Sequence, residues 1–374
     1  MLTLPDYPWD AVGPYREQAE KHPGGMVNLS IGTPVDPTPQ VVREALTRAA
    51  DAPGYPTTHG TAGLRQAVVD WFFRRRGVPG LDPQNVLPTI GSKELVAWLP
   101  TLLGLGPGDV VVRPKIAYPT YDIGAQLAGA EAIALDDVLD CDEQTLKRVR
   151  LIWLNSPGNP TGRVDSVQWM ARVVELARSI GAVVASDECY AELPWEVDEV
   201  PSILDPRVAG PNHQNLLAVY SVSKQSNLAG YRAAFAAGCP QLIAGLLNTR
   251  RHAGMIVPAP VQEALRAALE DDAHVDAQRE IYRRRRLVLR PALETAGFAV
   301  EHSAAGLYLW CREDAAAQRS DGASGTWAQV QRMAERGILV GPGVFYGEAG
   351  EGFIRVALTA SDERIQTAAE RLGS

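Results

Sequence analysis

The sequence of 374 residues lacks the cysteine and histidine patterns that bind metals. Its four cysteines are scattered and form no Cys-x-x-Cys pair, and its six histidines show no spacing typical of metal ligands. Zinc sites and disulfide frameworks need clustered or regularly spaced cysteines. We therefore predict no metal site and free thiols, which favour a reducing compartment such as the cytoplasm.

The sequence also lacks a hydrophobic run of the ~20 residues needed to cross a membrane. Its first residues, Met-Leu-Thr-Leu-Pro-Asp-Tyr-Pro, have neither the basic start nor the apolar core of a secretory signal. These two absences predict a cytoplasmic protein that makes no contact with a membrane.

Positive charge is in deficit. The 36 lysines and arginines against 44 acidic residues give a net charge of −8 at pH 7, and the basic residues are dispersed. This balance argues against nucleic acid as a partner. The run of four arginines at 283–286 is an exception, but it lies in a helical pattern with Ile281 and Leu287. We interpret it as a solvated helix face.

The sequence does contain enough apolar residues, 46% of the chain, for a large core and a second, smaller lobe. Short apolar strands alternate with helical patterns up to about residue 268, which predicts an α/β fold whose mostly parallel sheet is covered by helices on both faces. The strands that this pattern indicates are 110–112, 132–135, 151–154, 183–186 and 216–221.

A long helix is expected over 276–296, and after it the pattern becomes α+β, with strands near 307–310, 338–340 and 353–358. We predict an N-terminal segment, 1–38, that packs with a small C-terminal domain, 269–374. The large domain between them, 39–268, would contain the ligand site, because open α/β sheets bind ligands at the carboxyl ends of their strands.

A lysine near the end of an apolar strand gives the strongest chemical signal. The segment Ser221-Val222-Ser223-Lys224 ends the strand expected over 216–221, and Arg232 lies eight residues beyond the lysine. A lysine can form a Schiff base with an aldehyde, and an arginine binds phosphate through charge-assisted hydrogen bonds. The segment can therefore serve an aldehyde cofactor that carries a phosphate, which the serines and Arg232 would hold.

Two further apolar strands end in polar residues. One leads into the turn around Asn159-Pro160, and the other ends at Asp187, three residues before Tyr190. Ligands bind at the carboxyl ends of the strands in open α/β sheets. A buried Asp187 can pair with the protonated nitrogen of a pyridine ring, and the phenol of Tyr190 can donate to an oxygen attached to the same ring.

Two other segments supply sites for anions. Gly91 and Ser92 open a helical pattern, and the free N–H groups at a helix N-terminus suit a phosphate. Arg355 interrupts a strand pattern that is otherwise apolar, so it needs a partner if its face is buried.

Taken together and in order, these segments resemble the class I/II aminotransferases, which are pyridoxal-phosphate enzymes of fold type I. The resemblance covers almost the whole chain and includes Ile31-Gly32-Thr33-Pro34, Tyr55, Tyr118-Pro119 and Asn159-Pro160-Thr161-Gly162. More narrowly, Gly-Thr-Pro-Val-Asp-Pro, Leu-Asn-Ser-Pro-Gly-Asn-Pro-Thr-Gly and Arg-His-Ala-Gly-Met resemble the actinobacterial succinyldiaminopimelate aminotransferases.

The resemblance implies a homodimer with shared pyridoxal-phosphate sites and assigns a role to each matching residue. The catalytic residues are Lys224, Asp187 and Tyr190. The residues implied in cofactor binding are Gly91, Ser92, Lys93, Tyr118, Asn159, Asp187, Tyr190, Ser221, Ser223, Lys224, Arg232 and, from the neighbouring subunit, Tyr55. The residues implied in substrate binding are Gly32, Asn159 and Arg355, with Arg355 on the α-carboxylate.

Several of these residues have a plainer interpretation. The alternatives are a turn residue for Asn159, a core tyrosine for Tyr118, local packing for Tyr55, a helix cap for Asp187 and an exposed edge-strand arginine for Arg355.

The expected reaction is the transfer of an amino group from glutamate to N-succinyl-2-amino-6-ketopimelate. The alternatives are an aminotransferase for aspartate, alanine or aromatic substrates, and a carbon–sulfur lyase. A cofactor-binding regulatory module is a third possibility, but such modules carry a DNA-binding domain before the family pattern, which here begins near residue 28. The cations available for a distal carboxylate are Lys93, Lys115, Arg251 and His252.

Overall fold

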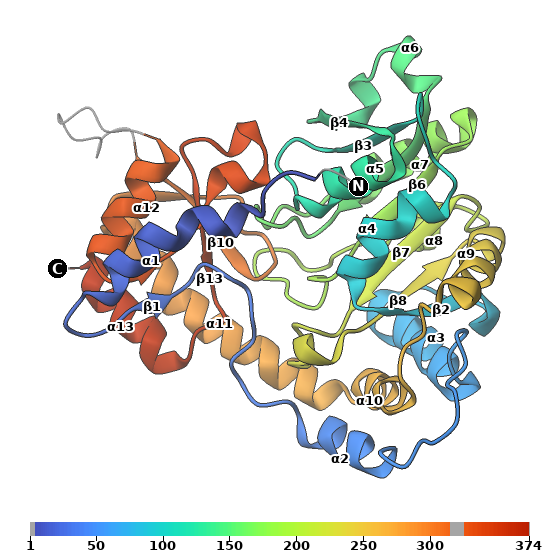
Figure 1. Ribbon diagram of the computed structural model, residues 1–374, viewed down its shortest axis with the longest axis horizontal. Coiled ribbons are helices and arrows are strands. Elements are labelled where there is room, and N and C mark those ends of the chain that lie inside the picture. The colour runs from blue at the N-terminus through green and yellow to red at the C-terminus, as the bar shows by residue number, and fades with distance from the viewer. Residues whose placement is uncertain (1–3, 315–324, 374) are drawn as a thin grey trace.

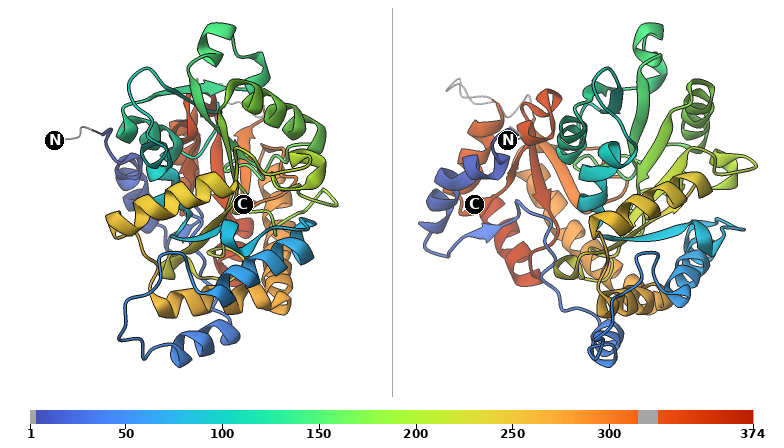
Figure 2. Two further views of the ribbon diagram at one scale, coloured as in Figure 1. Left: turned by 90° about the vertical axis from the view of Figure 1, so that its right-hand side faces the viewer. Right: turned by 45° about the vertical axis from the view of Figure 1, so that its right-hand side comes forward.

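The computed structural model describes residues 4–314 and 325–373. Figure 1 shows a larger lobe on the right, built on a seven-stranded sheet, and a smaller lobe on the left, built on a four-stranded sheet. Figures 1 and 2 show helix α11 (Asp272–Thr295) running from one lobe to the other. None of the helices in the described ranges combines the length and the apolar character that crossing a membrane requires.

The seven-stranded sheet is mostly parallel, which confirms the predicted α/β fold. Only β8 runs antiparallel to its neighbours. The strands lie in the order β2 (Val86–Ile90), β8 (Ala233–Gly238), β7 (Leu216–Ser221), β6 (Val183–Asp187), β5 (Val149–Asn155), β3 (Val110–Pro114) and β4 (Glu131–Leu135).

The apolar pattern predicts β3 to β7. It does not single out β8, an alanine-rich strand whose six residues are all buried.

Helices cover both faces of this sheet, as a largely parallel sheet requires. One face packs against α4 (Ser92–Leu102), α5 (Thr120–Ala128) and α9 (Pro240–Ala253). The other face packs against α3 (Ala62–Arg76), α7 (Val167–Ile180), α8 (Pro206–Ala209) and α10 (Ala259–Glu270). The same lobe also contains α2 (Gln40–Arg48) and α6 (Glu143–Leu146).

Local sequence sets where these helices begin and end. The Thr61 hydroxyl accepts a hydrogen bond from the first turn of α3, and the Ser166 hydroxyl does the same for α7. Such caps satisfy backbone donors that have no partner within the helix. Both helices end at a glycine in the left-handed conformation, Gly77 and Gly181, which lacks the Cβ that disfavours this geometry.

The four-stranded sheet is antiparallel, in the order β12 (Gly341–Pro342), β13 (Ile354–Ala357), β10 (Tyr308–Glu313) and β9 (Phe298–Glu301). Around it lie α1 (Gly13–Glu20), α12 (Thr326–Glu335) and α13 (Asp362–Leu372). Strand β1 (Val27–Asn28) pairs in parallel with β11 (Ile338–Leu339). This pairing joins the N-terminal segment to the C-terminal part of the chain, and the predicted domain division at residues 38 and 268 stays a prediction.

The prediction that the arginines at 283–286 form a solvated helix face is wrong for Arg285 and Arg286, which are buried. The side chain of Arg285 is 3% exposed and bonds to Asp36 and Asp362, at 2.6 Å to the nearest oxygen of each. Arg286 pairs with Glu196. The two buried arginines tie α11 to other segments because their partners lie far away in the sequence.

A buried ion pair holds the start of α4 in place. The guanidinium of Arg250 on α9 is fully buried and donates to both carboxylate oxygens of Glu94, at 2.8 and 3.1 Å. Because Glu94 lies in the first turn of α4, this pair fixes the N-terminus of a helix that borders the candidate site.

We predict that Glu94→Gln lowers the free energy of unfolding by about 3 kcal/mol, because it leaves a buried arginine without its counter-charge. The matched control is Glu143→Gln, which breaks an exposed pair with Lys147 and should cost less than about 0.5 kcal/mol. Urea unfolding of both variants measures the difference. Equal effects of the two substitutions would contradict the importance of the Glu94 pair.

Candidate active site

A cavity of about 630 Å³ lies where the carboxyl ends of β5, β6 and β7 face the four-stranded sheet. Its volume is in the range of small-molecule sites. All but two of the predicted site residues line it. These are Gly32, Ser92, Lys93, Tyr118, Asn159, Asp187, Tyr190, Ser221, Ser223, Lys224, Arg232 and Arg355. The exceptions are Gly91, which contacts Arg232, and Tyr55.

The sheet topology explains why these residues meet. Strands β5, β6 and β7 are neighbours and run in parallel, so their carboxyl ends share one edge. Asn159 follows β5, Asp187 ends β6, and Lys224 follows β7. Residues that are far apart in the sequence therefore line one cavity.

Asp187 is a buried carboxylate that lacks a cationic partner within the described ranges. It is 7% exposed and accepts hydrogen bonds from the Tyr121 hydroxyl at 3.1 Å and the Cys189 N–H at 3.2 Å. Burial raises the pKa of Asp187, and hydrogen bonding by the side chain and backbone of Cys189 and by Tyr121 only partly opposes the rise. Because a buried carboxylate favours a positive partner, the protonated ring nitrogen of pyridoxal phosphate fits this position.

The amine of Lys224 points to the N-terminal segment, where its Nζ donates to the carbonyl oxygen of Gly32. Burial lowers the pKa of Lys224; Tyr308 opposes this shift, and the positive charge of Arg355 adds to it. A lower pKa increases the unprotonated fraction of the amine, which is the form that attacks a carbonyl.

The first turn of α4 and three neighbouring side chains can hold an anion. Ser92 opens the helix, and the hydroxyls of Ser221 and Ser223 lie 2.7 Å apart on the same cavity. Gly91 has a φ of +73°, and a Cβ at this position would lie 2.3 Å from Nη2 of Arg232. The close approach of Arg232 therefore depends on glycine at 91. Helix N–H groups, hydroxyls and a guanidinium suit a phosphate.

Arg355 on β13 is 4% exposed, so its charge is removed from water. Its Nη1 donates to Asn159 Oδ1 at 3.0 Å, and its Nη2 donates to the carbonyl oxygen of Ser30 at 2.7 Å. Its Nε is buried and has no hydrogen-bond partner among the described residues. A substrate carboxylate would satisfy this donor and compensate the charge.

Tyr308 on β10 is a cavity residue that sequence reasoning missed. Its ring lies 3.9 Å from the guanidinium carbon of Arg355, and its hydroxyl lies 3.2 Å from the Tyr190 hydroxyl. The available signal was the alternation of side chains along a strand. Using that signal requires the pairing of β10 with β13, which the sequence does not reveal.

The two tyrosines of the segment 117–121 have different surroundings. Tyr118 lines the cavity. Tyr121 donates to Asp187 and stacks on Trp153 in the core, with 4.9 Å between ring centroids. That Tyr118 stacks on the cofactor stays a prediction.

The cations proposed for a distal carboxylate are not equally placed. Lys93 is exposed and lines the cavity, with its Nζ 5.8 Å from the ring centroid of Tyr7. Lys115 pairs with Asp136 outside the cavity, and Arg251 and His252 also lie outside it.

Tyr55 also lies outside this cavity and is fully exposed, at 102%. Its side chain does not reach the site of its own chain.

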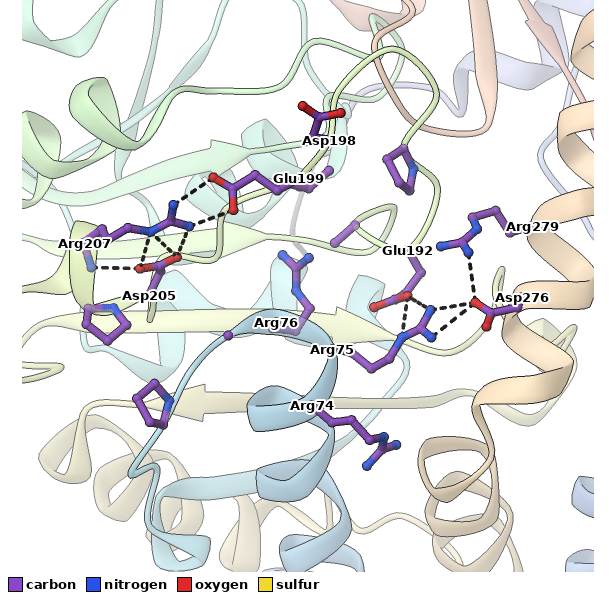
Figure 3. A pocket seen from close by; sticks show the side chains of 16 residues that line it. Arg74, Arg75, Arg76, Glu192, Asp198, Glu199, Asp205, Arg207, Asp276 and Arg279 are labelled. Atoms are coloured by element: carbon purple, nitrogen blue, oxygen red, sulfur yellow. Dashed lines mark hydrogen bonds and ion pairs between the residues drawn. The ribbon is translucent and has the colours of Figure 1, made fainter.

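A second cavity, of about 720 Å³, is lined by charged side chains (Figure 3). Five arginines and five carboxylates balance each other there, and most of them form ion pairs. Arg76 instead bonds at 3.3 Å to Glu188, which follows Asp187 in the chain. Because this cavity contains none of the predicted site residues and its lining carries no net charge, we assign the candidate site to the smaller one.

Comparison with known proteins agrees with this geometry. Residues 24–372 match the family model described as aminotransferase class I and II. The chain is 54% identical to 4-dedimethylamino-4-oxo-anhydrotetracycline transaminase OxyQ from Streptomyces rimosus, with 100% of each chain covered. It is 52% identical to the probable aminotransferase Rv1178 of Mycobacterium tuberculosis, over 99% of this chain and 85% of that protein.

A solved structure extends the likeness to the fold. The probable N-succinyldiaminopimelate aminotransferase from Thermus thermophilus superposes with a TM-score of 0.86 at 29% identity, covering 98% of this chain and 99% of that one. The family model matches most of the chain, and two relatives are more than 50% identical to it. This chain therefore belongs to the class I and II aminotransferases, which are pyridoxal-phosphate-dependent transaminases.

Proposed function

We propose that the cavity holds pyridoxal phosphate between Lys224 and Asp187. The observation that carries this proposal is that one cavity contains three groups: a lysine of lowered pKa, a buried carboxylate and a buried arginine. Among the residues that the structure describes, the carboxylate has no cationic partner and the Nε of the arginine has no hydrogen-bond acceptor. In this arrangement Asp187 holds the ring nitrogen. Tyr190 and Asn159 donate to the ring oxygen, and Tyr118 stacks on the ring.

The phosphate is held by Ser221, Ser223, Arg232 and the backbone N–H groups of Ser92 and Lys93. The bound cofactor supplies an electron sink that lets a proton leave the substrate α-carbon. Lys224 would hold the cofactor aldehyde through its amine. With its amine free, Lys224 Nζ would be placed to take a proton from the substrate α-carbon.

For the substrate, Arg355 grips the α-carboxylate of both the amino donor and the keto acceptor, with Asn159 and the backbone of Gly32 beside it. We propose glutamate as donor and N-succinyl-2-amino-6-ketopimelate as acceptor. The position of Lys93 on the cavity supports a distal carboxylate, and the likeness to a probable N-succinyldiaminopimelate aminotransferase supports this substrate class.

A second candidate acceptor is a ketone on a polycyclic ring. The 54% identity to OxyQ over the whole chain favours it, because the name of that relative describes a 4-oxo-anhydrotetracycline as substrate. Apolar side chains on the cavity, including Trp9, Ile31 and Phe345, are compatible with a flat ring system.

We also propose a homodimer in which Tyr55 reaches the phosphate of the neighbouring subunit. The complete exposure of Tyr55 in a single chain and its position outside its own cavity support this arrangement.

We predict that borohydride reduction of the loaded enzyme traps the cofactor on Lys224. Lys224→Ala should lose the trapped adduct and nearly all transamination, because among the described residues Lys224 is the one lysine on the cavity that is not exposed. Peptide mapping by mass spectrometry identifies the modified lysine, and Lys115→Ala serves as the control that keeps the label. An adduct on another lysine would refute the assignment.

We predict that Gly91→Ala weakens pyridoxal-phosphate binding by at least about tenfold, because the new Cβ displaces the guanidinium of Arg232 and removes a charge-assisted contact. Gly104→Ala is the matched control. It has a similar φ of +78° but no atom within 4 Å of the new Cβ. Titration of both apoenzymes with cofactor gives the affinities, and equal affinities would show that Arg232 does not hold the phosphate.

We predict that Tyr55 acts across the dimer, which subunit mixing can test. In hybrids of wild type with Tyr55→Phe/Lys224→Ala subunits, the remaining lysine site receives the altered residue 55. It should bind cofactor roughly tenfold more weakly, as expected for a lost hydrogen bond to a charged group. Hybrids with Lys224→Ala subunits keep a native Tyr55 and form the control. Identical affinity in both hybrids would place Tyr55 outside the shared site.

We predict that Lys93→Gln lowers kcat/KM for the succinylated substrate about tenfold, through the loss of one charge-assisted contact, and spares aspartate and alanine. The backbone N–H at 93 remains, so cofactor binding should persist, and Lys115→Gln is the control. The assay compares N-succinyl-diaminopimelate with aspartate, alanine, phenylalanine and a polycyclic amine. If another substrate matches or exceeds the succinylated one, the specific substrate is wrong and the aminotransferase assignment stands.

A further inference from the structure

Tyr308 lies between the groups that the two lobes contribute to the site. It comes from β10 of the four-stranded sheet and is 5% exposed. On one side its ring covers Arg355, and on the other its hydroxyl meets the Tyr190 hydroxyl from the loop after β6. None of the roles proposed above uses this side chain.

The ring of Tyr308 is the nearest of three aromatic rings around Arg355. The guanidinium carbon lies 3.9 Å from the Tyr308 centroid, compared with 4.9 Å for Tyr346 and 5.7 Å for Trp9. A desolvated cation over an aromatic face is stabilised by the charge distribution of the ring. Contact with a ring face also restricts the guanidinium to one plane, which a bidentate carboxylate grip requires.

The hydroxyl of Tyr308 occupies a confined position beside the lysine. A Cβ on Gly32 would lie 2.1 Å from this oxygen, so the hydroxyl packs directly against the Gly32 backbone. Lys224 Nζ donates to the carbonyl oxygen of the same residue. The phenol of Tyr308 therefore lies next to the amine as well as the Tyr190 phenol.

The charged and titratable groups around Tyr308 come from both lobes. They are Arg355 on β13, Lys224 after β7, Tyr190 after β6, Tyr346 near β12, Tyr118 before α5 and Tyr282 on α11. Burial raises the pKa of Tyr308, but Arg355 and Lys224 outweigh it and the net shift is downward. The same proximity raises the pKa of Lys224 against the effect of burial.

Resting on the function proposed above, we propose that Tyr308 is a positioning residue with two separable parts. Its ring holds the Arg355 guanidinium flat for a substrate carboxylate. Its hydroxyl holds the Tyr190 phenol in place beside the Lys224 amine. One side chain thus sets the carboxylate grip, the Tyr190 phenol and the Lys224 amine relative to each other.

The test compares Tyr308→Phe, which keeps the ring, with Tyr308→Leu, which loses both parts. We expect Tyr308→Phe to lower kcat roughly three- to tenfold, as for one lost hydrogen bond, with KM for glutamate within about twofold of wild type. Tyr308→Leu should in addition raise KM roughly tenfold, through the lost cation–π contact. Tyr15→Phe, which removes a tyrosine hydroxyl outside the cavity, is the control.

A spectroscopic measurement separates positioning from simple packing. The absorbance of the bound cofactor is titrated with pH in each loaded enzyme. We expect the midpoint in Tyr308→Phe to fall by roughly 0.5 pH unit, because an oxygen that favours the protonated lysine nitrogen has been removed. An unchanged midpoint with unchanged kcat would overturn the role of the hydroxyl. A rise in KM in Tyr308→Phe as large as in Tyr308→Leu would overturn the division into two parts.

A failure of the proposal for Tyr308 can be distinguished from a failure of the proposed function. Borohydride labelling of Lys224 in wild type, Tyr308→Phe and Tyr308→Leu shows whether the cofactor occupies the assigned site. If wild type itself is labelled elsewhere, the proposed function is wrong. If all three are labelled at Lys224, the kinetic and spectroscopic differences report on Tyr308 alone.

Discussion

The buried carboxylate of Asp187 constrains the rest of the site. It lies at the end of a central strand, 7% exposed, with two hydrogen-bond donors and no cation among the described residues. A carboxylate in this position remains ionised only if positive charge reaches it. The side chain of Asn155 holds the backbone at this position, because its Nδ2 donates to the carbonyl oxygen of Asp187 at 3.0 Å. Behind it, Glu188 is held by Arg76, Ser202 and the Ile203 N–H.

The second constraint is the link between the lobes. Arg355 belongs to the four-stranded sheet, yet its guanidinium bonds to Asn159 of the large lobe and to the Ser30 carbonyl of the N-terminal segment. Arg285 makes a similar connection, from α11 to Asp36 and Asp362. The site is therefore assembled from three parts of the chain, and buried arginines join them at a cost in desolvation that specific partners offset.

The sequence predicted the features that depend on local pattern. Near-continuous apolar strands indicated the parallel sheet, and the polar residues at their ends indicated the site, because parallel strands share an edge. All but two of the predicted residues line one cavity. Their individual roles stay predictions, as do the domain boundaries and the dimer.

Features that depend on distant partners were not predictable. The burial of Arg285 requires Asp36 and Asp362, which lie far away in the sequence. The contact between Tyr308 and Arg355 requires the register of β10 against β13, and the pattern of a single strand does not contain it. In the same way, the selection of Lys93 among four candidate cations follows from the three-dimensional position of α4.

The central claim is that Asp187 pairs with a protonated ring nitrogen. The most direct measurement is the affinity of the apoenzyme for pyridoxal phosphate and for an analogue in which carbon replaces the ring nitrogen, in wild type and in Asp187→Asn. Wild type should prefer the natural cofactor by roughly 10- to 100-fold, the range for a hydrogen bond between charged groups, and Asp187→Asn should lose most of that preference. The same preference in both proteins would contradict the pairing of Asp187 with the ring nitrogen.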